Sequence, residues 1–265
     1  PELLNRCCRA GAATTYGRGV NPAYGTPALW RNVMNNSDNV LEPVGKSAYV
    51  YQLPIRIWHW TMVACVSVLI VTGYIIGKPW LSVTGQPYDT FYMGYTRMAH
   101  FIAGFILIIS TVLRYLYALI GNRYSRELVI LPFWRKSWWG GLWSDIRWYL
   151  FLDKEPRVYV GHNPLAQAGM AVGMVFMLII MLSGLGLYAQ SAPQSPIFRP
   201  FLFMLDLMYW VGGNDQELRS LHRLGMLLLV TFVTVHIYMV IREEIMGKTT
   251  LVSTMISGFR ERRRS

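Results

Sequence analysis

Arg219–Arg242 reads RSLHRLGMLLLVTFVTVHIYMVIR, and its apolar centre, Leu224–Val235, has one histidine near each end. These histidines, His222 and His236, are fourteen residues apart, which in a helix is about 1400° of rotation and leaves both imidazoles on one face. Their separation along the axis is about 21 Å, or about two-thirds of a hydrocarbon core of roughly 30 Å. The stretch therefore predicts a membrane-spanning helix with a histidine near each surface.

The two histidines of this helix suit the binding of haem iron. Polar side chains at such depth are costly and need partners. An imidazole nitrogen can bind haem iron, so one helix with two such ligands could hold two haems stacked across a bilayer. The other histidines must then supply the opposite axial ligands.

The composition places the chain among membrane proteins. Of its 265 residues, 53% are hydrophobic and 14% aromatic, and the mean hydropathy is +0.30, which is too apolar for an ordinary soluble domain. The net charge of +11 raises the alternative of nucleic-acid binding. The basic residues cluster between and after apolar segments, where membrane topology puts them, so we predict a lipid membrane and no nucleic acid as partner.

The cysteines indicate neither a disulfide framework nor a covalent haem. Cys7 and Cys8 are adjacent, Cys65 lies inside an apolar run, and no CxxC or CxxCH motif occurs. A covalently attached haem of the c type is therefore not expected.

Three further segments have the length and apolarity of a membrane span. His59 stands at the start of the first and His100 at the start of the second, whereas the third has no internal histidine and is spaced with glycines that permit close approach. The segments are Ile57–Gly77, Met98–Ile120 and Pro164–Ala189, and the glycines of the third are Gly169, Gly173, Gly184 and Gly186. We predict an all-α membrane protein, a bundle of four transmembrane helices that holds two haem b groups.

The first part of the chain predicts no folded unit. Pro1–Pro43 is rich in Asn, Gly, Ala and Arg, and it lacks a sustained periodicity and an apolar core long enough for a signal peptide. We expect a poorly ordered N-terminal extension over residues 1–45 and one transmembrane di-haem cytochrome b domain over residues 46–265.

The loops predict the orientation. Gly121–Asn163 mixes basic residues with tryptophans, which is typical of an amphipathic helix lying in the membrane interface. The lysines and arginines put this connection and both termini in the cytoplasm, with Lys78–Arg97 and Gln190–Arg219 facing outward.

This topology pairs the histidines by depth. His59 and His236 lie at the cytoplasmic level, and His100 and His222 lie at the outer level. Any one histidine near a helix end can be an interfacial hydrogen-bond donor. Four that match in depth two by two favour axial ligands of two haems.

Certain arginines are candidates for binding haem propionates. Arg114 lies fourteen residues beyond His100 on the same face, at the level of the inner pair. A snorkelling arginine near a helix end explains it equally well. Arg97, Arg219 and Arg223 offer the same two readings at the outer level.

His162, in GHNP, has two readings as well. Asn163 as an N-cap and Pro164 in the first turn indicate a helix start, so a capping or interfacial role is the simpler one. The alternative is that His162 borders a quinone pocket near the inner haem and helps to deliver a proton.

Several motifs in a fixed order cover roughly Tyr51–Phe259. They are RIWHW at Arg56–Trp60 with Thr72-Gly73, MGYTRMAHF at Met93–Phe101, GNRYSRE at Gly121–Glu127, HNPLAQ at His162–Gln167, YWVGGN at Tyr209–Asn214, and HRLGM with VHIYM in the last helix. Together these motifs resemble the cytochrome b subunit of membrane-bound nickel-iron uptake hydrogenases.

The resemblance implies a role in electron transfer. It implies that His59, His100, His222 and His236 are the haem b ligands and that the chain anchors the large and small hydrogenase subunits on the bacterial inner membrane. It further implies a redox subunit of a hydrogen:quinone oxidoreductase complex, with no catalytic residue for hydrogen oxidation itself and with quinone as electron acceptor.

Two alternatives remain open. The first keeps the haems but changes the electron donor, as in the membrane cytochromes of formate dehydrogenases or thiosulfate reductases. The second is a transporter that uses intramembrane polar groups as a substrate path, although no inverted repeat or broken helix pair is evident. A reduced-minus-oxidised spectrum separates a cytochrome from a transporter.

Overall fold

A computed structural model describes residues 48–79, 91–154, 159, 161–191, 194–210 and 213–261. The predicted extension over residues 1–45, most of the loop before Arg97, and the arginines after Glu261 lie outside the described residues.

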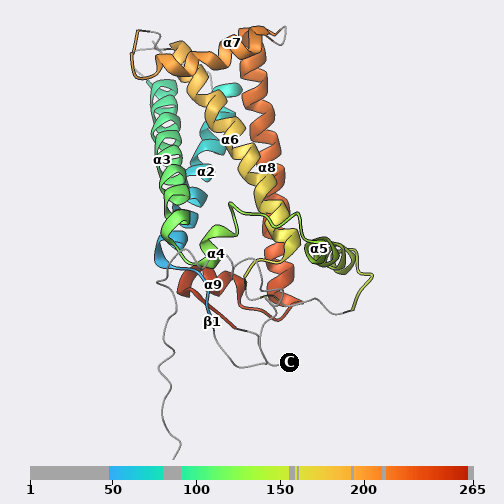
Figure 1. Cartoon of the computed structure of the whole chain (residues 1–265). Helices are drawn as coiled ribbons and strands as arrows, with labels where there is room; N and C mark the ends of the chain where they lie inside the picture. The colour runs from blue at the N-terminus through green and yellow to red at the C-terminus, as the bar shows by residue number, and fades with distance from the viewer. Residues whose placement is uncertain are drawn as a thin grey trace, which may run out of the picture. The chain divides into compact units, whose positions relative to one another are not determined.

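Four long helices form the body of the molecule (Figure 1). Each is long and apolar enough to cross a membrane, as the sequence predicts. They are α2 (Leu53–Gly77), α3 (Tyr92–Ile120), α6 (Pro164–Ser191) and α8 (Asp215–Ile245).

The helices extend beyond the apolar segments that predict them. α3 begins at Tyr92 rather than Met98, and α8 begins at Asp215 because the side chain of Asn214 accepts hydrogen bonds from the amides of Gln216 and Glu217 at 2.9 and 3.3 Å. Polar residues at a helix end keep the backbone hydrogen bonds of the helix, so hydropathy alone does not show where the helix stops.

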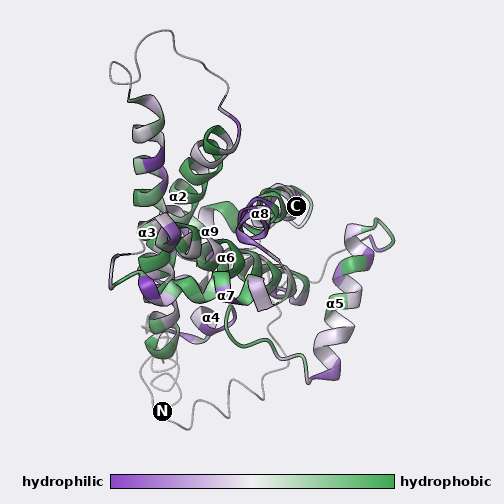
Figure 2. Cartoon of the chain, turned by 90° about the horizontal axis from the view of Figure 1, so that it is seen from above, coloured by the Kyte–Doolittle hydropathy of each residue, from purple (hydrophilic) through white to green (hydrophobic). Residues whose placement is uncertain are grey.

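The helices pack as two pairs. α2 lies mainly against α3, α6 lies mainly against α8, and α3 also contacts α6. The buried centre contains residues from all four helices, namely Cys65, Val66, Leu107, Met177 and Leu229. This cluster, which we call the central core, separates the two ends of the bundle. Many other apolar side chains are exposed, which suits a surface covered by lipid. Figure 2 colours the residues of the helices by hydropathy.

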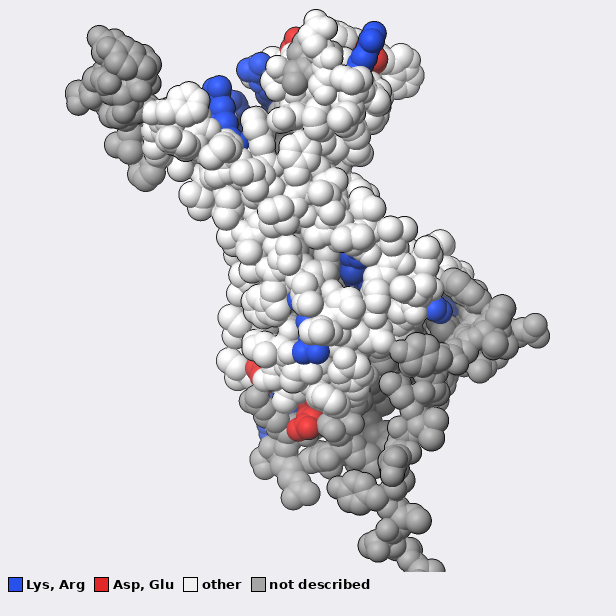
Figure 3. Space-filling view, turned by 90° about the vertical axis from the view of Figure 1, so that its left-hand side faces the viewer, with Lys and Arg blue, Asp and Glu red and all other residues white. Residues whose placement is uncertain are grey.

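The two ends carry different small elements. η1 (Arg199–Leu202) and α7 (Phe203–Trp210) lie at one end, which we call the outer end after the predicted orientation. α4 (Arg123–Arg126), α9 (Leu251–Ser257) and a two-stranded antiparallel sheet lie at the other, the inner end. Figure 3 shows a broad band without charged side chains below the charged outer end.

The small sheet joins the first and last described segments. β1 (Ala48–Tyr49) pairs with β2 (Phe259–Arg260), and the amides of Val50 and Tyr51 donate to the carbonyl of Gly258 at 2.9 and 3.2 Å. The sequence does not predict this sheet, because two-residue strands show no periodicity. We call β1, β2 and α9 the terminal clasp.

A helix forms within the long basic connection, as predicted. α5 (Lys136–Tyr149) packs against α6 and stands to one side of the bundle in the view of Figure 2. Trp138 donates to Gln167 Oε1 at 2.8 Å, and Arg242 donates to the carbonyls of Trp148 and Tyr149 at 2.7 and 2.8 Å. A buried arginine thus caps the C-terminal end of α5 and ties it to α8. That α5 lies in the membrane interface stays a prediction.

Candidate functional site

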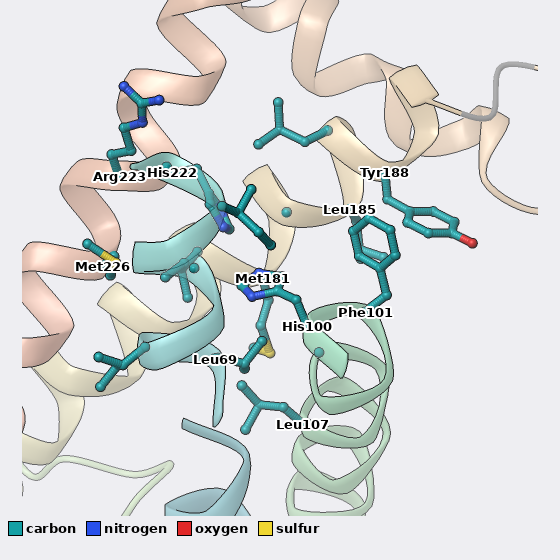
Figure 4. Close-up of a pocket in the computed structure, with 18 of the residues that line it drawn as sticks. Leu69, His100, Phe101, Leu107, Met181, Leu185, Tyr188, His222, Arg223 and Met226 are labelled. Carbon is teal, nitrogen blue, oxygen red and sulfur yellow. The ribbon is translucent and has the colours of Figure 1, made fainter. Parts of the chain in front are cut away.

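A pocket of about 870 Å³ lies among the four long helices at the outer end (Figure 4). His100 of α3 and His222 of α8 point into it, with ring centres 6.4 Å apart and ring planes at 70°. The rest of the wall is mainly apolar and includes Leu69, Phe101, Leu107, Met181, Tyr188 and Met226. This size and lining are typical of a pocket for a cofactor.

The separation of the two imidazoles fits a shared metal ion. Two imidazoles bonded at about 2 Å to opposite sides of one ion have ring centres roughly 6 to 6.5 Å apart once the ring radii are added. The 6.4 Å between His100 and His222 is within this range. The pair therefore fits the two axial ligands of a haem iron.

Hydroxyl groups fix the proton positions of both rings. Thr72 Oγ1 lies 2.8 Å from His100 Nδ1 and donates its proton to the carbonyl of Val68 at 2.7 Å. Because the hydroxyl proton is committed to a carbonyl, Oγ1 accepts a hydrogen bond from Nδ1–H. This network assigns the proton of His100 to Nδ1 and leaves the Nε2 lone pair for a metal.

His222 is held in the same way from the other helix pair. Ser183 Oγ lies 2.9 Å from His222 Nδ1 and donates to the carbonyl of Ile179 at 2.7 Å. Ser183 is fully buried. The lone pair of His222 is therefore also on Nε2.

A glycine follows each of these hydroxyl residues and makes room for the ring. A Cβ at Gly73 would lie 3.2 Å from His100 Cε1, and one at Gly184 would lie 3.1 Å from His222 Cε1. Of the glycines predicted to permit close approach, Gly173 and Gly186 also face nearby side chains, whereas a Cβ at Gly169 would meet nothing within 4 Å. The approach of rings to helix backbones at the outer end thus needs Gly73 and Gly184.

Cations surround the mouth of the outer pocket. The side chains of Lys78, Arg97, Arg219 and Arg223 line it and are exposed. They could pair with carboxylates of a bound group, but solvent screens such exposed charges.

The structure places His59 and His236 together at the inner end. His59 lies within electrostatic range of His236 and His162, and His236 lies within that range of His162. The His59 ring packs edge-on against Trp60, with ring centres 5.3 Å apart, and the His236 ring stacks on Phe232 at 5.9 Å. His59 Nδ1 is buried without a hydrogen-bond partner among the described residues. The pairing by depth is thus seen in the fold, whereas the ligand role of the histidines stays a prediction.

Arg114 brings a buried positive charge to the inner end. It is 5% exposed, and its Nη2 donates to the carbonyl of Ser125 at 2.6 Å. Its Nε and Nη1 and the Nε1 of Trp58 are buried without a partner among the described residues, and the guanidinium lies 5.5 Å from the Trp58 ring centre. Buried donors of this kind need an acceptor, and a carboxylate satisfies both their geometry and the charge of Arg114.

His162 is hydrogen-bonded through both ring nitrogens. Its Nδ1 lies 2.8 Å from Glu127 Oε2 and its Nε2 lies 2.9 Å from the hydroxyl of Tyr51, whose pKa is raised by burial. Because a carboxylate only accepts, Nδ1–H donates to Glu127, and the protonated hydroxyl of Tyr51 donates to Nε2. Asn163 Oδ1 accepts from the amide of Ala166 at 2.6 Å, which confirms the predicted helix start.

The sequence did not indicate that Thr72 and Ser183 hydrogen-bond the histidines, or that the indole N–H of Trp58 is buried without a partner among the described residues. Thr72-Gly73 and Ser183-Gly184 share a pattern, a hydroxyl residue followed by glycine inside an apolar segment. That pattern was a usable signal, because a hydroxyl in a membrane helix beside a glycine can reach a group on the neighbouring helix. Tyr51 and Glu127 are far apart in sequence, so spacing could not have joined them.

A bundle of four membrane-spanning helices with a histidine pair inside it defines the class of membrane cytochromes. The chain belongs to the prokaryotic cytochrome b561 family, whose model matches residues 50–258. It is therefore a multi-pass membrane protein of a haem b family. This match and the relatives described next confirm the resemblance drawn from its motifs.

The relatives carry similar names. The chain is 48% identical over 228 residues to the "Probable Ni/Fe-hydrogenase 1 B-type cytochrome subunit" of Escherichia coli (strain K12), covering 86% of this chain and 94% of that protein. It is 43% identical over 219 residues to a "Probable Ni/Fe-hydrogenase B-type cytochrome subunit" of Azotobacter vinelandii, covering 81% and 88%. A protein of the same name from Rhodobacter capsulatus is 41% identical over 222 residues, covering 81% of each.

Proposed function

We propose that this chain anchors a nickel-iron hydrogenase on the bacterial inner membrane and passes electrons from it through two b haems to the quinone pool. The observation that carries the proposal is the outer pocket, where His100 and His222 stand at the separation of two axial ligands with their lone pairs on Nε2. The names of the relatives support the hydrogenase large and small subunits as partners. Haem, when bound, supplies one-electron transfer.

The proposal assigns residues to each haem. His100 and His222 hold the outer haem, and His59 and His236 hold the inner one. Arg114 and Trp58 bind a carboxylate of the inner haem, which is supported by their buried donors without partners among the described residues. The alternative of a snorkelling arginine fits less well, because Arg114 is 5% exposed and bonds a backbone carbonyl.

The proposal puts quinone reduction at the inner end, on the cytoplasmic side. An external electron donor reaches the outer histidines first, and a deeper haem is useful only if the acceptor lies near it. His162 is near His59 and His236 and is linked to a carboxylate and a phenol, which supports its assignment to proton delivery. Charge movement across the membrane would store up to about 2.3 kcal/mol per charge per 100 mV.

Haem content tests the ligand assignment. His100→Ala and His222→Ala should each remove one haem of two, since each haem loses an axial ligand, and should abolish hydrogen-dependent quinone reduction. His162→Gln is the control and should keep both haems. The measurements are haem per protein and the reduced-minus-oxidised spectrum of the purified complex. Unchanged haem in both alanine variants contradicts the pairing, and a wild-type protein without a b-type band contradicts a cytochrome.

Orientation and the quinone side need separate tests. A reporter fused after Gly258 should behave as cytoplasmic, and an external signal would reverse the topology. In sealed vesicles of known orientation, hydrogen oxidation with quinone should generate a potential that is negative on the cytoplasmic side. Turnover without a potential would move quinone reduction to the outer end.

A further inference from the structure

We infer that Thr72 and Ser183 are positioning residues for the outer haem and that their hydrogen bonds make it the haem of lower reduction potential. The inference rests on the proposed function, because it assumes that His100 and His222 are axial ligands. The four axial histidines alone give neither the role of Thr72 and Ser183 nor the order of the two reduction potentials.

The two hydrogen bonds share one direction. In each case the imidazole Nδ1–H donates to a hydroxyl oxygen whose own proton is bonded to a helix carbonyl at 2.7 Å. The Nδ1 to oxygen distances are 2.8 Å for His100 and 2.9 Å for His222. A hydroxyl that donates to a carbonyl becomes a better acceptor, because hydrogen bonds in a chain polarise one another.

Thr72 and Ser183 differ from other hydroxyl residues of the long helices in their contact with a histidine. Ser67 and Thr231 also donate to carbonyls one turn back, at 2.8 and 2.9 Å, but they are exposed, and neither hydrogen-bonds a histidine in the described part of the chain. Back-bonding alone is thus the ordinary state of a hydroxyl in a membrane helix. Thr72 and Ser183 differ because each also bonds a ring that packs on the next glycine.

The hydrogen bonds at Nδ1 affect how strongly each imidazole donates electrons to the iron. A hydrogen bond from Nδ1–H to an acceptor raises the basicity of a metal-bound imidazole. A more basic ligand stabilises the oxidised iron and lowers the reduction potential. Both outer histidines have such an acceptor, whereas the Nδ1 of His59 has none among the described residues.

Charge also affects the two potentials. The buried guanidinium of Arg114 offsets the negative charge of the haem carboxylate that it is proposed to bind, so that carboxylate stabilises the oxidised state less at the inner end. The four cations at the outer mouth are exposed, and solvent and salt screen them. Hydrogen bonds and charge therefore act in the same direction, and electron transfer from the outer to the inner haem is downhill.

A redox titration of the purified complex tests the order of potentials. The wild type should show two midpoint potentials, and His100→Ala should remove the lower one. Disappearance of the higher one overturns the inferred order. If His100→Ala removes neither haem, the ligand assignment itself has failed, which is a distinguishable result.

Thr72→Val and Ser183→Ala test the positioning role. Each should move the lower midpoint to a more positive potential and change the electron paramagnetic resonance signal of that haem, while the higher midpoint stays in place. Thr231→Val and Ser67→Ala are matched controls and should change neither, and Thr72→Ser should keep the wild-type potential.

Two results decide the positioning role. Loss of the outer haem in Thr72→Val that Thr72→Ser reverses supports it, since the hydroxyl then holds the ligand. Full haem content with both midpoints unchanged in Thr72→Val and Ser183→Ala overturns it.

Discussion

At the outer end of the bundle, each histidine ring is hydrogen-bonded to a hydroxyl and lies against a glycine, and both rings line one pocket. At the inner end, His59 has a buried Nδ1 without a partner among the described residues, and the same holds for donors of Arg114 and Trp58. The central core lies between the two ends. The two histidine pairs thus lie in different surroundings, a shaped pocket with satisfied hydrogen bonds at the outer end and a buried charge with unpaired donors at the inner end.

The unpaired donors of the inner end indicate where a bound group would add the most stability. A buried donor without an acceptor costs about 1–3 kcal/mol, so a bound group that supplies an acceptor would stabilise the inner end more than the outer end. A carboxylate that pairs with Arg114 would remove this cost. The outer end has its polar atoms satisfied in advance and gains mainly contact with apolar walls.

The largest expected effect comes from removing an inner ligand. His59→Ala or His236→Ala should halve the haem content and also lower the unfolding temperature more than His222→Ala does, because the inner donors lose their acceptor. Haem per protein and thermal unfolding in detergent measure both effects. Equal loss of stability from inner and outer ligand variants would remove the distinction between the ends.

A matched pair of arginine variants compares charge at the two ends. Arg114→Gln should weaken inner haem binding by about 2 kcal/mol, or roughly thirtyfold, because a hydrogen bond to a charged group is lost in a buried site. Arg223→Gln, at an exposed position, should change outer haem binding by less than about 1 kcal/mol. Haem release to an acceptor protein reports both, and Arg114→Lys should retain part of the affinity. A larger effect from Arg223→Gln contradicts the comparison.

A matched pair of glycine variants tests whether the close approach of a histidine ring to a helix requires a glycine. Gly184→Ala should disturb the outer haem and cost about 1–3 kcal/mol, since its Cβ would meet His222 Cε1 at 3.1 Å. Gly169→Ala should leave both haems in place and stabilise α6 by up to about 1 kcal/mol, because alanine favours a helix more than glycine does. Visible spectra and unfolding temperature distinguish the two outcomes, and identical behaviour would show that the ring does not need the glycine.

The smallest effects belong to two tyrosines outside the membrane spans. Tyr51→Phe should lower the free energy of unfolding by about 1 kcal/mol through loss of the bond to His162, with both haems retained. Tyr209→Phe removes an exposed bond to Asp215 at the outer end and should have no measurable effect. Denaturant unfolding in mild detergent compares them. A larger loss of stability in Tyr209→Phe than in Tyr51→Phe would contradict this prediction, because the exposed bond to Asp215 would then stabilise the protein more than the partly buried bond to His162.

The sequence predicted the helices well because a membrane span requires a long apolar run. His222 and His236, fourteen residues apart in one such run, also allowed the two histidine levels to be predicted. Helix ends were less predictable, since Tyr92 and Asp215 extend helices with residues that carry no hydropathy signal.

Contacts between helices could not be predicted in the same way. Whether Thr72 reaches His100, or Arg242 reaches the carbonyls of Trp148 and Tyr149, depends on how each helix is rotated against its neighbour. Periodicity gives the face of one helix but not the partner of that face. The unpaired indole N–H of Trp58 could not be predicted either. Tryptophan near a helix end is common in membrane proteins and does not by itself indicate a buried donor.

The terminal clasp has a consequence for the order of events during synthesis. β1 is made before any of the long helices, but its partner β2 is made after all of them, so the ladder closes only after the four long helices have been synthesised. α9 then settles against the start of α2, where Trp60 donates to the carbonyl of Met255 at 3.0 Å. Trp60 is next to His59 in the chain, so the surroundings of His59 are complete only after α9 and β2 have been synthesised.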